Sequence, residues 1–388
     1  MKMQFKLKAL AAAGMMMMAG AASAAVVGGG ATLPEDLYNG DSGNDGILTK
    51  ATPGFNTYIG VGSGNGKSAF FNNDATKFSL AAGTTVDYAG SDSLVSATEA
   101  QNYKTNSESA FGPLIQVPSV LTSVTVPFNV SGLSALNLTS EKLALIFADP
   151  SVLKWNDTKL GIPNAPNADI KVVYRAEESG TTEIFLRHLN AVDSGLVSSV
   201  NKDFAKAINV ASSSKYIAAT GSDGVVSAVN NNAYSIGYVS PDKVEYGNPA
   251  KVVAITRTVN GQQQNLLPTE VNVQAVLNTV TLPSTATDKA DPLKWGISNA
   301  NPSEGYPIVA STNLIFSQCY QNADDAEKIL SFFEQHYGST DNDAAIKAHG
   351  FVSLRNDWKQ AIFDTFWDAG SDLSIGNPNV CNGIGRPQ

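Results

Sequence analysis

The most informative part of the sequence is YRAEESGTT, residues 174–182, together with the apolar run that precedes it. That run, Ile170 to Tyr174, is rich in β-branched residues and is typical of a short strand. After the stretch, Phe185 and Leu189 stand at helical spacing, so a helix begins near residue 180. The first N–H groups of a helix are free and lie at its positive end, here beside the planar donor group of Arg175. The pattern predicts an α/β unit whose turn binds an anion; the alternative is a polar helix start without a ligand.

Strands and helices alternate through the rest of the chain as well. Val86 to Ala89 and Ser235 to Val239 are predicted strands. Ala323 to Tyr337 is a predicted helix that stops at Gly338, and Trp358 to Trp367 is another. This alternation predicts an α/β architecture.

Length and composition limit the class of protein. The 388 residues suffice for two or three compact domains, and 43% hydrophobic with 16% charged residues is ordinary globular composition. Acidic residues, 35, exceed the 26 basic ones, so the formal net charge is −9. A protein that binds nucleic acid shows a basic face, so we expect no nucleic-acid partner.

The N-terminus has the pattern of a secretory signal peptide. Basic residues at Lys2, Lys6 and Lys8 precede an apolar core, Ala9 to Ala22, and an A-x-A cleavage site ends at Ala24. The core is too short to span a bilayer comfortably, which disfavours the alternative of a membrane anchor. We therefore expect residues 1–24 to be removed and the mature chain to be periplasmic or secreted.

The chain has two cysteines, Cys319 and Cys381. In an oxidising compartment two cysteines usually pair, and a loop of this length corresponds to ~4 kcal/mol of stabilisation. The alternative is two buried free thiols. The cysteines and histidines do not have the spacing of a metal site, so we expect no metal and no cofactor.

Three further segments have residues that favour an anion. In GGGATLPE, residues 28–35, Thr32 and Glu35 have the spacing of a capping box, and the glycines allow close approach of a ligand to the backbone. GVGSGNGKS, residues 60–68, lacks the first glycine of a nucleotide P-loop, which disfavours a nucleotide but not a small anion. Asp92 follows a predicted strand, and its alternative role is that of a helix cap.

In combination these segments resemble the phosphate-binding proteins of bacterial ABC phosphate transporters and, within them, the DING proteins. The resembling stretches cover nearly the whole mature chain: Gly28 to Pro34, Tyr58 to Lys67, Ala89 to Ser93, Ile115 to Val120, Val172 to Thr182, Ala219 to Val225, Tyr306 to Cys319 and Ser374 to Gln388. The Asp-Ile-Asn-Gly start of that subfamily is replaced by AVVG at residues 25–28. Ala144 and Asp193 stand where family members often have a second disulfide, so only the Cys319–Cys381 bridge is expected.

The resemblance implies a two-lobed periplasmic-binding-protein fold of the type II-like class. Two crossing strands join the lobes, near Val120 and near Tyr306, and the ligand lies in the cleft between the lobes. One lobe would consist of residues 25–120 plus 306–388, and the other of residues 121–305.

The resemblance also implies a function. We expect high-affinity binding of inorganic phosphate outside the inner membrane, as the substrate-binding component of an ABC phosphate permease, by a monomer that is not an enzyme. The implied ligand set comprises the hydroxyls of Thr32, Ser63, Ser179 and Thr181, the backbone N–H groups of Leu33, Ser63, Gly180 and Thr181, the guanidinium of Arg175 and the carboxylate of Asp92. An ionised Asp92 can accept a hydrogen bond from the proton that phosphate carries and sulfate lacks.

Two other functions stay open. DING proteins are sometimes credited with phosphomonoesterase activity, which needs a metal pair or an activated nucleophile. The three histidines, His188, His336 and His349, have no ligand-like spacing and are expected to be exposed or packed helix residues. The third candidate is a secreted adhesive or assembly-forming protein, which only the export signal supports.

Overall fold

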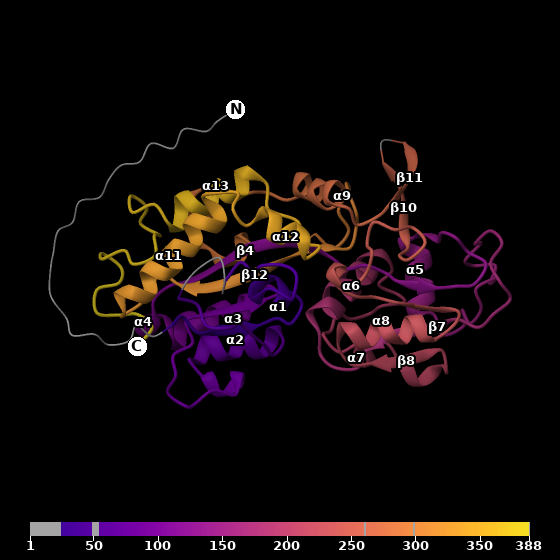
Figure 1. The fold of residues 1–388 in the computed structure, drawn as a ribbon, viewed down its shortest axis with the longest axis horizontal. Helices are drawn as coiled ribbons and strands as arrows, with labels where there is room; N and C mark the ends of the chain where they lie inside the picture. The colour runs from indigo at the N-terminus through magenta and orange to yellow at the C-terminus, as the bar shows by residue number, and fades with distance from the viewer. Residues whose placement is uncertain (1–24, 49–53, 260, 298, 388) are drawn as a thin grey trace.

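The computed structural model describes residues 25–48, 54–259, 261–297 and 299–387. The predicted signal peptide, residues 1–24, lies outside them. Figure 1 shows two lobes side by side, one containing the indigo N-terminal and yellow C-terminal parts and the other the middle of the chain. Both lobes combine sheets with helices, so the predicted α/β class is confirmed. Among the described residues, no helix combines the length and the apolar character that crossing a membrane requires.

The first lobe is built on a five-stranded sheet with the order β2-β1-β3-β12-β4. The first three of these strands are parallel, whereas β12 is antiparallel to both neighbours. The strands are β1 (Gly28–Gly30), β2 (Ile59–Gly60), β3 (Tyr88–Ser91), β4 (Leu114–Ser123) and β12 (Val309–Ser317). The helices around them are α1 (Glu35–Asn39), α2 (Ser63–Asn72), α3 (Ala97–Asn106), α4 (Glu108–Phe111), α11 (Ala323–Tyr337), α12 (Asp343–Ala348) and α13 (Asn356–Phe366).

The second lobe contains a four-stranded sheet with the order β5-β9-β7-β8 and a three-stranded sheet with the order β11-β10-β6. The four strands are β5 (Phe128–Asn129), β7 (Lys171–Arg175), β8 (Tyr216–Ala219) and β9 (Ser235–Gly237). The three are β6 (Asn137–Thr139), β10 (Ala254–Val259) and β11 (Gln262–Leu266). The helices are α5 (Ser140–Ala148), α6 (Gly180–Val192), α7 (Phe204–Ala207) and α8 (Gly221–Asn231).

Two neighbouring segments connect the lobes. Just after β4, the N–H of Val124 donates to the carbonyl of Ile308, and Thr125 then pairs with Val239 of the second lobe. The apolar core is continuous through this junction, because buried side chains from Val120 to Val130 belong to the same cluster as those of both lobes. The segments that follow β4 and precede β12 therefore run side by side between the lobes.

The stretch 270–297 packs beside the first sheet, although the predicted boundaries assign it to the second lobe. It contains α9 (Glu270–Gln274) and α10 (Ala286–Ala290). Gln116 Nε2 donates to the Pro292 carbonyl over 2.8 Å, and the Trp295 ring packs on Phe366 with centroids 5.3 Å apart. These contacts favour a second lobe that ends before residue 305; the boundaries themselves stay a prediction.

The local predictions for the clearest elements agree with the structure. Helix α11 has the predicted bounds, with Gly338 as its C-cap and with Ile329 and Phe333 buried. Strand β3 begins two residues later than predicted, at Tyr88. The reason is a side-chain contact, since the N–H of Val27 donates to Asp87 Oδ2 over 2.8 Å rather than to a strand carbonyl.

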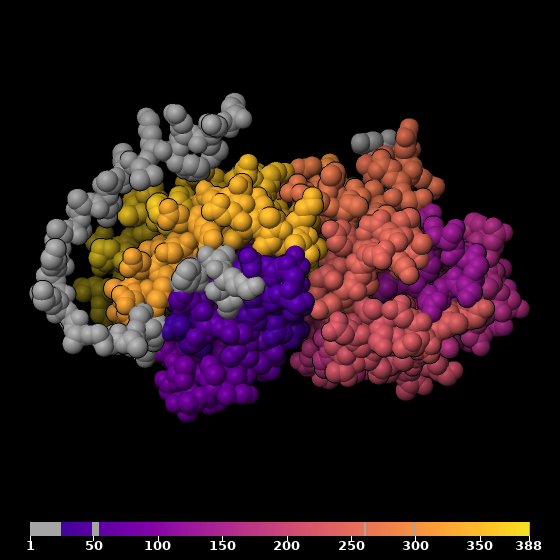
Figure 2. Space-filling model, in the orientation of Figure 1, coloured from indigo at the N-terminus to yellow at the C-terminus, as the bar shows by residue number. Residues whose placement is uncertain are grey.

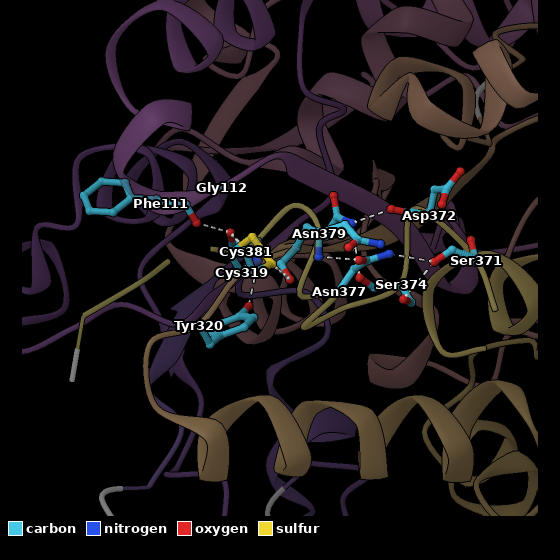
Figure 3. The surroundings of a disulfide bond; sticks show 12 residues. Phe111, Gly112, Cys319, Tyr320, Ser371, Asp372, Ser374, Asn377, Asn379 and Cys381 are labelled. Carbon is cyan, nitrogen blue, oxygen red and sulfur yellow. Dashed lines mark hydrogen bonds between the residues drawn. A yellow bond between two sulfur atoms is a disulfide. The ribbon is translucent and has the colours of Figure 1, made fainter. Parts of the chain in front are cut away.

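Cys319 and Cys381 form the predicted disulfide, with their Cα atoms 5.2 Å apart. Figure 3 shows it beside Gly112 and next to the loop that includes Asn377. A Cβ on Gly112 would lie 2.6 Å from the Cβ of Cys319, and its φ is +92°, so only glycine fits there. The bridge ties the C-terminal segment to the end of β12.

Arg386 holds the same C-terminal segment from inside the first lobe. Its side chain is fully buried, and Nη1 and Nη2 each donate over 2.7 Å, to the carbonyls of Val86 and Phe70. The guanidinium also lies 3.5 Å from the ring centroid of Phe70, a cation–π contact. Sequence reasoning missed this residue, because nothing near it in the chain reveals its partners.

Candidate functional site

The start of helix α2 lies unusually close to strand β1. A Cβ on Gly66 would be 2.5 Å from the Cα of Gly30, so both glycines are needed for this contact. Gly62, with φ of +87°, turns the chain into the helix, and Ser63 is the first helical residue. The close packing brings the free N–H groups of the α2 N-terminus to the edge of the sheet.

Lys67, the lysine of the P-loop-like run, has a structural role. It is buried, and its Nζ donates to Glu99 Oε2 over 2.8 Å and to the carbonyl of Leu94 over 3.1 Å. Burial lowers the pKa of its ammonium, and the Glu99 carboxylate opposes that shift. Its charge is therefore committed to a carboxylate of α3 and not to a ligand.

Asp92 stands directly after β3, at the same edge of the sheet. Its backbone N–H donates to Ser63 Oγ over 3.0 Å, which leaves the Ser63 hydroxyl with a proton to donate elsewhere. The alternative of a helix cap is wrong, because helix α3 begins at Ala97 and its cap is Ser96. The Asp92 side chain is buried, and its Oδ1 has no hydrogen-bond partner among the described residues. Such an oxygen is costly unless a ligand pairs with it.

The surroundings of Asp92 favour its protonated form. Burial raises the pKa of the carboxyl to about 7, and the nearby Glu183 carboxylate also raises it. The Thr312 hydroxyl and the cations Arg175 and Lys202 lower the same pKa, but by less than burial raises it. A ligand that donates a hydrogen bond to the carboxylate would stabilise its charged form.

Arg175 is the last residue of β7 and is almost fully buried. Its Nε donates to Glu177 Oε1 over 2.6 Å, and its Nη1 lies 3.4 Å from Ser222 Oγ. Glu177 therefore fixes the orientation of the guanidinium and offsets its charge. We did not single out Glu177 from the sequence; the signal was a carboxylate two residues after the strand-ending arginine.

The N-terminus of α6 carries the other predicted ligands. Ser179 is the N-cap, and its Oγ accepts from the N–H of Thr182 over 3.5 Å. Gly180 and Thr181 are the first helical residues, so their N–H groups lack acceptors within the helix. Gly180 faces Asp92 across the lobes: a Cβ on it would lie 2.8 Å from Asp92 Oδ2. The structure thus brings the Asp92 and Gly180 segments into contact although they are distant in the chain.

The segment with Thr32 and Leu33 differs from its prediction. Helix α1 begins at Glu35, and its N-cap, Pro34, makes no side-chain cap bond, so the expected capping box does not form. The reason is tertiary, because Glu35 Oε1 accepts from the N–H of Gly60 over 3.1 Å. Thr32 is exposed and Leu33 is buried. Their contacts with a ligand stay a prediction.

The histidines are packed structural residues, as predicted. His188 Nδ1 lies 2.8 Å from the carbonyl oxygen of Ala300, and His336 Nε2 lies 2.9 Å from that of Ser119. Burial lowers the pKa of both rings to about 4. His349 is also buried. In the part of the chain that the structure describes, no three His, Cys, Asp or Glu side chains gather as metal ligands would.

The site therefore combines two helix N-termini, a buried guanidinium, hydroxyls and one buried carboxylate. The donors suit an oxyanion, and the carboxylate suits an oxyanion that still carries a proton. Asp92 and Ser63 come from the first lobe, whereas Arg175 and Gly180 come from the second. An anion held by all of them would lie between the lobes.

Known proteins share this architecture. Residues 19–334 match the family model of the PBP superfamily domain. A solved high-affinity periplasmic phosphate-binding protein, PfluDING bound with phosphate, is 42% identical with a TM-score of 0.81, over 94% of this chain and 99% of that one. The chain belongs to the PBP superfamily, in the branch of the DING proteins. Both the resemblance stated above and the two-lobed fold are confirmed.

Other known proteins match over similar lengths. A structure described as a human phosphate binding apolipoprotein is 41% identical, with a TM-score of 0.82, over 94% of this chain and 100% of that one. "Alkaline phosphatase L" of Pseudomonas aeruginosa is 41% identical over 361 residues, 92% of each chain. A "Phosphate-binding protein" from an unknown prokaryotic organism is 42% identical over 386 residues, 92% of this chain and 98% of the relative.

Proposed function

We propose that this chain captures inorganic phosphate between its lobes, as the substrate-binding component of phosphate uptake. The proposal rests on the buried carboxylate of Asp92, which lies against the N-terminus of α6. Its Oδ1 has no hydrogen-bond partner among the described residues. Ionised, Asp92 can only accept hydrogen bonds, so it favours an oxyanion with a proton to donate. Phosphate near neutral pH is such an anion, and sulfate is not.

The other groups supply the positive side of the site. Arg175 contacts Glu177 through Nε and Nη2 and Ser222 through Nη1. Each Nη carries a second N–H, and these two form a planar donor pair that suits two oxygens of one anion. The N–H groups of Gly180 and Thr181, and those at the start of α2, donate from positive helix ends. Because the chain as a whole carries a net charge of −9, affinity has to come from these short-range donors.

Closure of the lobes completes the ligand shell. Lys243 of the second lobe lies 2.8 Å from Asp36 Oδ2 on α1 of the first, so an ion pair connects the two lobes. Lys243 also lies 3.3 Å from Asp242 and 3.8 Å from Asp223 in its own lobe, so it keeps partners when the lobes separate. The proposed cycle is therefore a hinge motion in which binding closes the site and opening releases phosphate.

The same proposal includes a place and a partner. The chain works as a monomer in the periplasm or outside the cell, after removal of residues 1–24, and delivers phosphate to an ABC permease of the inner membrane. Its support is the membership of the DING branch, one of whose solved members is described as periplasmic.

Calorimetric titration tests the function directly. Protein stripped of carried-over phosphate by unfolding and refolding is titrated with phosphate, arsenate and sulfate. Tight binding of phosphate and arsenate with weak binding of sulfate is expected, because only the first two carry a proton for Asp92. Equal affinity for sulfate, or no binding of phosphate, would refute the proposal. Size-exclusion chromatography in the same buffer tests the monomer.

A second candidate is a phosphomonoesterase, favoured by the relatives named "Alkaline phosphatase L". It predicts that pure protein releases phosphate from an aryl phosphate ester with turnover. Measuring release with and without a chelator, and in the variant Arg175→Ala, distinguishes it from binding alone. Phosphate release that persists in pure protein and is lost in Arg175→Ala would establish the activity. Release that disappears on purification would exclude this candidate function.

A further inference from the structure

We propose that Lys202 is a further phosphate-positioning residue, a second cation that extends from the N-terminus of α6 across to the N-terminus of α2. The inference rests on the proposed function and adds a residue to the same site. Lys202 is in none of the four anion segments recognised from the sequence, and the structure alone places it there.

The backbone of Lys202 is tied to the site. The N–H of Ser179, the N-cap of α6, donates to the carbonyl of Lys202 over 3.0 Å. The lysine therefore moves with the second lobe and with the donors of α6. Its side chain points the other way, toward the first lobe: Nζ lies 3.5 Å from the position that a Cβ on Gly64 would occupy. Gly64 is the second residue of α2, directly after Ser63.

The charges around the site leave Lys202 a distinct role. Arg175 is already paired with Glu177. Asp92 is buried, Glu183 is partly buried and pairs with Arg187, and each of these two carboxylates has an oxygen without a partner among the described residues. By contrast, no carboxylate of the described residues forms an ion pair with Lys202 within 4.0 Å. It is close enough to Asp92 to lower the pKa of that carboxyl. Its positive charge is thus the one in the site that no carboxylate pairs.

Two consequences follow for a dianion. In the open form, an unpaired cation at the edge of the site attracts phosphate against the negative charge of the whole chain, which raises the association rate and makes it depend on salt. In the closed form, the same ammonium faces the α2 N-terminus and adds a second positive charge to the surroundings of the bound anion. Lys202 therefore affects both capture and release.

Binding kinetics of inorganic phosphate test the role. Lys202→Met is compared with wild type and with Lys202→Arg, and Lys206→Met serves as the matched control. Lys206 is a neighbouring exposed lysine that pairs with Glu178 and Asp203 outside the site. We expect Lys202→Met to lower the association rate about tenfold at low salt and to flatten its salt dependence. Lys202→Arg keeps most of the wild-type rate, and Lys206→Met is unchanged.

The outcomes separate the two proposals. If wild type binds phosphate and Lys202→Met has the same association rate, affinity and salt dependence as wild type, Lys202 has no part in the site. If wild type binds no phosphate, the proposed function itself fails, whatever the variants do. Thermal unfolding of the ligand-free proteins shows whether Lys202→Met is folded, and Lys202→Gln replaces it if it is not.

Discussion

Replacing Asp92 by Asn removes the group that, in the proposed site, discriminates between oxyanions by their protonation. The amide has nearly the same shape, but it can donate as well as accept. Phosphate loses a hydrogen bond to a charged group, worth about 1.5–3 kcal/mol. Sulfate gains a hydrogen-bond donor at a position where, in the wild type, it faces a buried negative charge. Together these changes lower the phosphate-over-sulfate ratio by at least about a hundredfold, since about 1.4 kcal/mol corresponds to a factor of ten.

Competition titration measures this ratio, with sulfate displacing phosphate from each protein. The matched control is Asp87→Asn, at the opposite end of β3. Asp87 is also buried and burial also raises its pKa to about 7, but it accepts from the N–H of Val27 and not from the site. The control should keep the wild-type ratio. An unchanged ratio in Asp92→Asn would show that the carboxylate does not select the ligand.

The same carboxyl predicts a pH dependence. Because burial raises its pKa to about 7, Asp92 takes up a proton in the folded, ligand-free protein well above the pH at which it does so when unfolded. Below about pH 7 the protonated form can donate to sulfate, so selectivity should fall as the pH falls. The ligand-free protein should also lose stability as the pH rises from about 4 to 7. Asp92→Asn should show no change of selectivity with pH and a smaller loss of stability, because Asp87, whose pKa burial also raises to about 7, keeps its own contribution. A pH-independent ratio in wild type would contradict the reasoning.

Substitutions at Arg175, at the disulfide and at Asp36 also have expected outcomes. Arg175→Ala should weaken phosphate binding at least about a hundredfold, and Arg175→Lys should not restore it, because an ammonium cannot reproduce the planar donor pair; calorimetry checks both. Removing the bridge by Cys319→Ser with Cys381→Ser should lower the free energy of unfolding by ~4 kcal/mol in a denaturant titration, and mass spectrometry of unreduced wild type should show the two cysteines linked. Asp36→Asn breaks the partly exposed pair with Lys243 and should raise the phosphate dissociation rate by up to about fivefold, with the association rate unchanged in stopped flow.

Local patterns account for the parts of this structure that the sequence predicts. The helix α11 has its predicted bounds, because its apolar spacing and its stop at Gly338 are properties of neighbouring residues. The strand, turn and helix around YRAEESGTT form for the same reason, with Ser179 as cap. The disulfide was predictable because the chain has only two cysteines to pair.

Contacts between residues distant in the chain determine the features that local patterns do not predict. Glu35 has the spacing of a capping-box partner, yet it accepts from Gly60, and Asp92 resembles a cap yet caps nothing. Lys243 pairs with Asp36 across 207 positions, a contact that no local pattern contains.

Composition and local patterns are enough to predict the α/β class, the anion-favouring helix starts and the residue types suited to a protonated oxyanion. The contacts of Asp92 with Gly180, of Glu177 with Arg175 and of Lys202 with α2 depend on the folded chain. The physical reason is that helix and turn propensities act over a few residues, whereas burial and charge pairing depend on which distant segments the fold brings together.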